Sequence, residues 1–164
     1  MRLPALLGAL SSFALACAPK PAAPPDTSAE DRAAVDRGHE AFLAAMQAGD
    51  CNALVAHLAE DGVMVAPNTP TAAGHAAIRA WCEPIFQQLK TTAVSVSGRD
   101  VVVSGDWAIE HGDFEWAVTP VAGGPEQREH GRFVAVWQRQ ADSSWKLVRD
   151  IWNSADPLPA AGAR

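Results

Sequence analysis

An acidic residue stands between apolar and aromatic residues near the end of the chain. Apolar and polar residues alternate over 145–154, and in a strand this would place Val148, Asp150 and Trp152 on one face and Leu147 on the other. A carboxyl group in apolar surroundings has a raised pKa, which suits it to acid–base catalysis near neutral pH. Asp150 is therefore a candidate catalytic residue. The alternative is a structural carboxylate that accepts a hydrogen bond from an indole or pairs with an arginine.

Two of the five histidines are candidates to assist Asp150. His39 falls on the apolar face of a predicted helix, where a neutral imidazole can act as a base or a donor. A core histidine with satisfied hydrogen bonds fits that position equally well. His111 falls on a predicted strand and is the second candidate.

A metal site is not predicted. His111, Asp113 and Glu115 share one face of their predicted strand, and His130 follows on the next strand. This set imitates a metal site, but no H-E-x-x-H or comparable spacing supports it. Alternating charges on a strand usually indicate a solvated face. We expect neither a metal nor another cofactor.

Tryptophan is the other unusual feature, with six in the chain. Indoles on one sheet can stack on a flat ligand, or they can simply fill the core of a small domain. We take Trp137 and Trp152 as the first pair of ligand-binding candidates, with Trp116 beside them. The remaining tryptophans are Trp81, Trp107 and Trp145.

The first residues resemble an export signal. Arg2 precedes an uncharged apolar stretch that ends in Ala14-Leu15-Ala16-Cys17. This ending resembles a bacterial lipobox, so we expect residues 1–16 to be a signal peptide and Cys17 to be lipidated. Plain secretion and a buried N-terminal helix are the alternatives. Proline-rich residues 17–27 would form a tether, and Ala18 implies outer-membrane sorting if the host is Gram-negative.

Two further cysteines remain, Cys51 and Cys82. In an oxidising compartment such a pair is a candidate disulfide, and two buried free thiols are the alternative. No C-x-x-C occurs, so a redox-active site is not expected.

Charge and motifs exclude several classes of function. The formal net charge of −6 repels phosphate backbones, so we expect no nucleic-acid partner. After the first segment no apolar run approaches the length of a membrane span. There is no G-x-S-x-G and no glycine-rich phosphate loop, so neither nucleophilic catalysis nor nucleotide binding is indicated.

The spacing of apolar residues predicts three helices followed by a sheet. The helices run from Ser28 to Gly49, from Asp50 through Leu58, and from Gly74 to Lys90. A short strand over 63–66 precedes the third helix. Later the apolar period changes to two, which predicts strands over 94–96, 101–103, 107–119, 128–140 and 145–154, with a turn at Gly98-Arg99-Asp100. We predict one α+β domain over residues 28–156, with helices packed on a strongly curved antiparallel sheet, and a flexible tail over 157–164.

The order and spacing of several segments resemble the nuclear-transport-factor-2-like superfamily, which includes ketosteroid isomerase and SnoaL-like domains. The resemblance covers about residues 28–156. Its carrying segments are Gly49-Asp50, Leu58-Ala59-Glu60-Asp61-Gly62, Gly74-His75-x-x-Ile78-Arg79, Gly105-Asp106-Trp107-Ala108, Val136-Trp137-x-Arg139 and Trp145 to Ser154. It implies a cone-shaped half-barrel with a pocket between sheet and helices, and a homodimer formed through the outer face of the sheet.

The same resemblance argues against steroid-isomerase chemistry. That reaction needs a carboxylate base and a tyrosine donor. The base of the family corresponds in position to Ala66, and the chain has no tyrosine. The resemblance also implies that Asp150 and Trp152 point toward the cavity.

Three hypotheses follow. The first is an exported or membrane-anchored module that binds a small apolar or aromatic molecule without turnover. The second is a cofactor-free isomerase, cyclase or lyase that uses Asp150 with His39 or His111. The third is a dimeric scaffold of the cell envelope.

Overall fold

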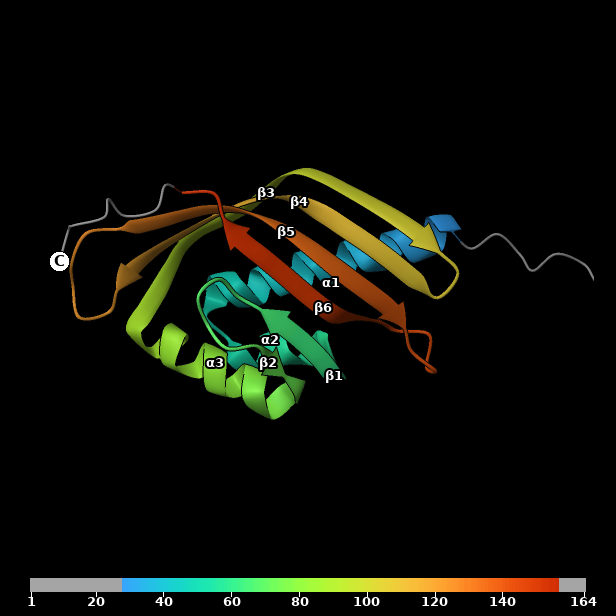
Figure 1. Ribbon diagram of the computed structural model, residues 1–164, viewed down its shortest axis with the longest axis horizontal. Coiled ribbons are helices and arrows are strands. Elements are labelled where there is room, and N and C mark those ends of the chain that lie inside the picture. The colour runs from blue at the N-terminus through green and yellow to red at the C-terminus, as the bar shows by residue number, and fades with distance from the viewer. Residues whose placement is uncertain (1–27, 157–164) are drawn as a thin grey trace, which may run out of the picture.

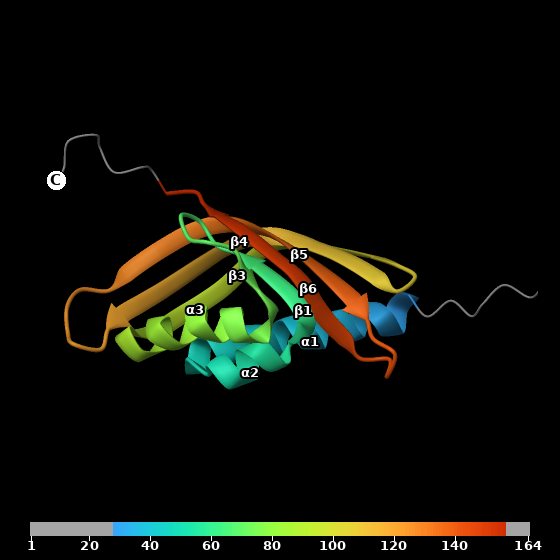
Figure 2. The same cartoon turned by 60° about the horizontal axis from the view of Figure 1, so that its bottom comes forward.

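The computed structural model describes residues 28–156, within which three helices lie on one face of a six-stranded sheet (Figures 1 and 2). The helices are α1 (Ser28–Ala48), α2 (Cys51–Ala56) and α3 (Gly74–Gln88). The strands are β1 (Leu58–Val65), β2 (Ala72–Ala73), β3 (Leu89–Ser104), β4 (Trp107–Pro120), β5 (Gln127–Arg139) and β6 (Trp145–Ser154). Cys17, the predicted signal peptide, the tether and the tail lie outside the described residues. No helix within 28–156 is long and apolar enough to cross a membrane.

The sheet is mixed, so the expected purely antiparallel arrangement is wrong. Its strand order is β2-β1-β6-β5-β4-β3. Strands β3 to β6 form the predicted antiparallel meander, but β1 pairs with β6 in parallel. The reason is topological: β1 belongs to the helical first half of the chain and enters the sheet beside the last strand. β2 and β3 remain as edges, so the sheet is open.

The segment around Gly62 also differs from the prediction. α2 ends at Ala56 rather than Leu58, and β1 begins at Leu58, earlier than expected. Asp61 and Gly62 do not separate two elements but lie inside β1, where its pairing with β6 is irregular between Leu58 and Val63. A Cβ at Gly62 would approach the carbonyl oxygen of Ala59 to 2.9 Å, so the irregular backbone leaves no room for a side chain.

β3 is one continuous strand, so the predicted turn at Gly98-Arg99-Asp100 is wrong. Ser97 pairs with Asp113 and Asp100 pairs with His111, so that two residues of β3 stand opposite Gly112. This is a β-bulge, and Gly98 has the positive φ of 58° that favours glycine in such a place. A second irregularity lies between Thr91 and Ala93. Each extra residue exchanges the inward and outward faces of the strand.

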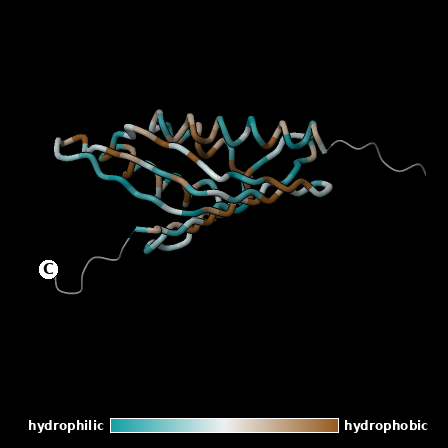
Figure 3. Tube along the Cα trace, turned by 90° about the horizontal axis from the view of Figure 1, so that it is seen from above, coloured by the Kyte–Doolittle hydropathy of each residue, from teal (hydrophilic) through white to brown (hydrophobic). Residues whose placement is uncertain are grey.

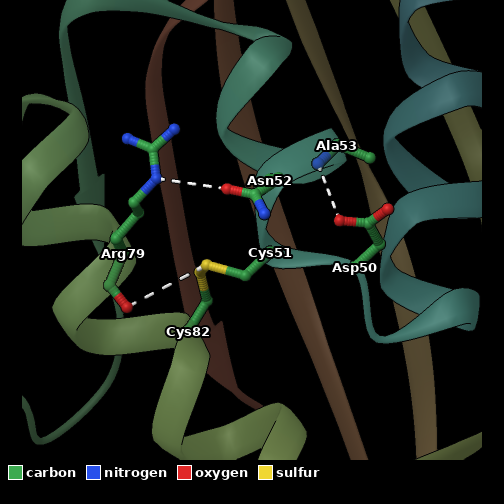
Figure 4. The surroundings of a disulfide bond; sticks show 6 residues. All are labelled: Asp50, Cys51, Asn52, Ala53, Arg79 and Cys82. Atoms are coloured by element: carbon green, nitrogen blue, oxygen red, sulfur yellow. Dashed lines mark hydrogen bonds between the residues drawn. A yellow bond between two sulfur atoms is a disulfide. The ribbon is translucent and has the colours of Figure 1, made fainter.

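Apolar residues of the helices meet the concave face of the sheet, and hydrophobic and hydrophilic segments alternate along the chain (Figure 3). Cys51 and Cys82 are joined by a disulfide that connects the start of α2 to α3 (Figure 4). The Asp50 side chain caps α2 by accepting a hydrogen bond of 3.0 Å from the backbone N–H of Ala53. The bridge and the cap together fix the short helix α2 against α3.

Candidate functional site

A cavity of about 100 Å³ lies between α1, α3 and the concave face of the sheet. Its wall is mainly aromatic: the side chains are Phe42, Trp81, Phe114, Trp116, Phe133, Trp137 and Trp152. Leucine, methionine, valine and alanine side chains complete the apolar part. Among the described residues that line it, only His39 and Asp150 carry ionisable groups. The cavity therefore offers a large apolar surface with two polar positions.

Asp150 is 8% exposed, and its position on β6 turns it toward the cavity. Within residues 28–156 its carboxyl group has no hydrogen-bond partner. Burial raises the pKa of Asp150 from 3.8 to about 7, and the negative charge of nearby Glu110 adds to the rise. The carboxyl group thus changes between its neutral and charged forms near neutral pH, as a proton donor or acceptor must.

The alternation predicted for β6 is interrupted by one residue. Trp137 pairs with Leu147 and Val136 pairs with Arg149, so Val148 is the extra residue of a bulge. Leu147 consequently lines the cavity, and the prediction that it faces the opposite side from Asp150 is wrong.

Glu110 on β4 is fully buried directly behind this wall. Its Oε1 atom lies 2.6 Å from Nδ1 of His39 and accepts a hydrogen bond of 2.8 Å from Nε of Arg99. Its Oε2 atom accepts a hydrogen bond of 2.8 Å from the indole N–H of Trp137. Burial acts to raise the pKa of Glu110, but the hydrogen bonds and charges of His39 and Arg99 hold it below its ordinary value. Glu110 is therefore a buried carboxylate whose two oxygen atoms both accept hydrogen bonds.

The contact with Glu110 fixes the orientation of His39. A carboxylate is only an acceptor, so Nδ1 of His39 carries the hydrogen and donates it. The other ring nitrogen, Nε2, has no hydrogen-bond partner in the part of the chain that the structure describes. The preceding residue, Gly38, brings α1 close to the sheet, since a Cβ there would lie 2.9 Å from the Trp137 ring. His39 thus meets the cavity with one nitrogen held and one unbound.

Arg99 reaches Glu110 because of the bulge in β3. Val94 and Val96 face inward, so Arg99 would face outward if the strand alternated regularly. The extra residue at the bulge shifts the alternation by one and turns Arg99 inward. Nη1 of Arg99 also lies 2.6 Å from Oδ1 of Asp36 on α1. Arg99 is therefore a counter-ion shared by the buried Glu110 and Asp36, and it ties α1 to the sheet.

The register of the strands places both acids in one row. Glu110 pairs with Ala135, and Ala135 pairs with Asp150. Partners across strands project from the same face, so only the methyl group of Ala135 stands between the two carboxyl side chains. This small side chain leaves open the part of the cavity next to Asp150.

The three tryptophans predicted to bind a ligand all line the cavity. The N–H of Trp137 is bound to Glu110, and the N–H of Trp116 donates a hydrogen bond of 3.1 Å to Oγ1 of Thr91. Trp152 packs edge-on against Trp81 of α3, with ring centroids 5.6 Å apart. Trp81 also lines the cavity. Helical spacing predicts its place on the third helix, but it is not among the ligand-binding candidates that the sequence indicates.

His111 lies elsewhere. Its side chain is 60% exposed on the outer face of the sheet, 3.9 Å from Oδ2 of Asp100. Asp113, Glu115 and His130 are also exposed or half-buried there, bound to arginines or to Asp156. Within 28–156, no three His, Cys, Asp or Glu side chains form a group able to hold a metal ion. The structure therefore brings His39, but not His111, to the cavity of Asp150.

The sequence pattern alone does not single out Glu110 or Arg99. The usable signal is the alternation of residues along β4. Ala108, Glu110 and Gly112 form one face, and the charged residues His111, Asp113 and Glu115 form the other. An acid among small residues on a buried face requires a partner. Arg99 is hidden by the bulge, because Gly98-Arg99-Asp100 has the composition of a turn.

Comparison with known proteins supports the same fold. The model of a family described as the SnoaL-like domain matches residues 39–148. No curated protein is similar enough in sequence to count as a match.

Solved structures with this fold include a ketosteroid-isomerase-like protein from Erwinia carotovora atroseptica, with a TM-score of 0.69 and 24% identity over 78% of this chain and 98% of that one. A candidate scytalone dehydratase from Novosphingobium aromaticivorans has a TM-score of 0.72 and 20% identity over 80% of this chain and 88% of that one. A nuclear-transport-factor-2-like protein from Salmonella enterica has a TM-score of 0.69 and 15% identity over 83% of this chain and 99% of that one. At these identities the likeness concerns the fold.

Proposed function

This chain belongs to the SnoaL-like domain family, and we propose that its cavity binds a small, flat, apolar or aromatic molecule whose polar group meets Asp150. The observation that carries the proposal is the unpaired, buried carboxyl group of Asp150 in a wall of aromatic rings. A buried carboxyl without a partner is costly, and a ligand that hydrogen-bonds or pairs with it removes that cost.

The size of the cavity limits the ligand. An apolar cavity of about 150 Å³ accommodates a benzene molecule. The cavity of about 100 Å³ described above is smaller than that, so a single ring fills it, and the substituents of the ring must extend through the opening or move side chains. We therefore expect ligands of one ring rather than of several fused rings.

The test is binding of single-ring compounds to the domain, measured by thermal shift and then by calorimetry. Saturable stabilisation without product formation supports a binding module. Absence of binding by any single-ring compound, neutral or charged, contradicts the proposal.

Acid–base catalysis is the second candidate, and the contact between His39 and Glu110 favours it. Nε2 of His39 would take a proton from the substrate, while neutral Asp150 would give one to a leaving hydroxyl group or a carbonyl oxygen. Both protons and the electron pair stay within the enzyme and substrate, so no cofactor is needed. An isomerisation, a cyclisation or an elimination fits this pair. If a bound compound turns over, Asp150→Asn should abolish the turnover and retain the fold; an unchanged rate would remove this candidate.

We further propose that the chain is exported and lipidated at Cys17. The bond between Cys51 and Cys82 supports export, because disulfides persist in oxidising compartments. The intact mass of the protein from its native host should show loss of residues 1–16 and addition of lipid. An unmodified full-length mass would contradict it.

Pairing of two copies through the outer face of the sheet is a further proposal. Val102, Ile109, Val134 and Ile151 are exposed there on four neighbouring strands. Exposed apolar patches of this kind often mark contacts between proteins. Light scattering should give the mass of a dimer at micromolar concentration, and a monomer would contradict the proposal.

A further inference from the structure

The charge of the cavity wall restricts the ligand further than its apolar character does. Among the described residues, no lysine or arginine lines the cavity. The guanidinium of Arg99, which does not line the cavity, is bound to Glu110 and Asp36. An anionic ligand would therefore enter an apolar space without a counter-charge, which is strongly unfavourable.

Negative charge, in contrast, is available at the wall. Asp150 faces the cavity without a hydrogen-bond partner, and Glu110 stands two strands away in the same row, behind the methyl group of Ala135. Glu110 is ionised, since Arg99 and His39 hold its pKa low. Each acid increases the negative potential at the position of the other. A positive charge beside Asp150 would give its carboxylate a partner and would offset the repulsion between Asp150 and Glu110.

The aromatic side chains provide the second contribution. Four indole rings and three phenyl rings surround the space next to Asp150. The negative faces of aromatic rings attract cations, tryptophan most strongly, and the attraction grows when water is excluded. The N–H groups of Trp116 and Trp137 are bound within the protein, so neither is available to an acceptor on a ligand.

We propose that the ligand of this cavity is a small organic cation, namely a protonated amine or a quaternary ammonium group on a body of about one ring, with its charge against Asp150. The inference rests on the proposed function, because it assigns a chemical class to the ligand of the same cavity. It does not require turnover.

A matched pair of ligands tests the inference. Benzylammonium and benzyl alcohol have the same shape and the same number of heavy atoms, but only the first is charged. Calorimetry at pH 8, above the pKa of about 7 for Asp150, should give an affinity for benzylammonium at least about ten-fold higher than for benzyl alcohol. In Asp150→Asn the preference should disappear, while benzyl alcohol still binds and so shows that the cavity remains intact.

Asp113→Asn is the control, because it makes the same change in net charge at an exposed acid on the outer face. It should keep the ten-fold preference. Equal or stronger binding of benzyl alcohol, or a preference that persists in Asp150→Asn, would overturn the cation inference and leave the proposed function standing. If neither compound binds, the cation inference is overturned, and the wider set of single-ring compounds decides the proposed function.

Discussion

Glu110 and Asp150 stand in one transverse row of the sheet, on either side of Ala135, and have opposite pKa shifts. Two strand spacings separate them, roughly 10 Å between backbones. Glu110 is surrounded by donors and is a stable anion, whereas Asp150 meets apolar side chains and titrates near pH 7. The same functional group thus has two roles, which its neighbours determine.

Asp150 should make the domain less stable as the pH rises. Its pKa is about 7 in the folded state against 3.8 ordinarily, so the folded state binds the proton more tightly, and stability is lost as the pH rises through this interval. We expect wild type to lose about 2–3 kcal/mol relative to Asp150→Asn between pH 5 and pH 8. Urea unfolding of both proteins across this range measures the difference.

Glu110 does not interfere with that measurement, because its pKa is below its ordinary value and it stays ionised above pH 5. Parallel curves for the two proteins from pH 5 to pH 8 would contradict the environment described for Asp150.

Replacement of Glu110 by Gln should be strongly destabilising. The change leaves the charge of Arg99 partly buried with one fewer carboxylate and places an amide against donors, so we expect a loss of about 3 kcal/mol or more in the free energy of unfolding. Asp36→Asn is the matched change at the more exposed partner of Arg99, and it should cost less than about 1 kcal/mol. If the two variants lose similar amounts of unfolding free energy, the burial of Glu110 does not account for the stability that its contacts with Arg99 and His39 provide.

Ala135 should control access to Asp150. Valine at this position adds two methyl groups between the acids, so we expect single-ring ligands to bind at least about ten-fold more weakly, with about 1–3 kcal/mol lost from overpacking. Val134→Ala changes the preceding residue, whose side chain lies on the outer face, and should leave the affinity unchanged. Calorimetry with both variants checks this, and undiminished binding by Ala135→Val would place the ligand elsewhere.

Removal of the disulfide should weaken the whole domain. Cys51 and Cys82 are 31 residues apart, and closing a loop of this length contributes about 3–4 kcal/mol by restricting the unfolded chain. The double variant Cys51→Ala and Cys82→Ala should lose that amount in chemical unfolding, and a reducing agent should then have no additional effect. If wild type in reducing agent remains as stable as before, the bond does not contribute.

Local sequence determines the helices and the last three strands well. The limits of α1, α3 and β6 follow from capping, glycine and alternation, because these signals act over a few residues. The direction of β1 does not follow, since its partner β6 is far away in sequence. The bulges do not follow either: each adds one residue to an otherwise regular alternation, and at Gly98 this addition has the composition of a turn.

Some residues of the candidate site can likewise be predicted from local sequence, and others cannot. Asp150 and His39 are recognisable because ionisable residues are unusual on apolar faces, and the tryptophans are recognisable because there are six of them in 164 residues. Glu110 is not, because its neighbour His111 has the more familiar chemistry while facing the opposite side. The pair of Glu110 and Arg99 depends on a register that only the assembled sheet defines.

The bulge at Gly98 and Arg99 has a consequence for how related chains can diverge. Loss of Arg99 would return β3 to regular alternation, with Gly98 alone opposite Gly112, and would leave the acid on β4 without its counter-ion. Insertions, deletions and charge changes at these two places must therefore arise together. Natural variants that lack Arg99 should carry an uncharged side chain where this protein has Glu110.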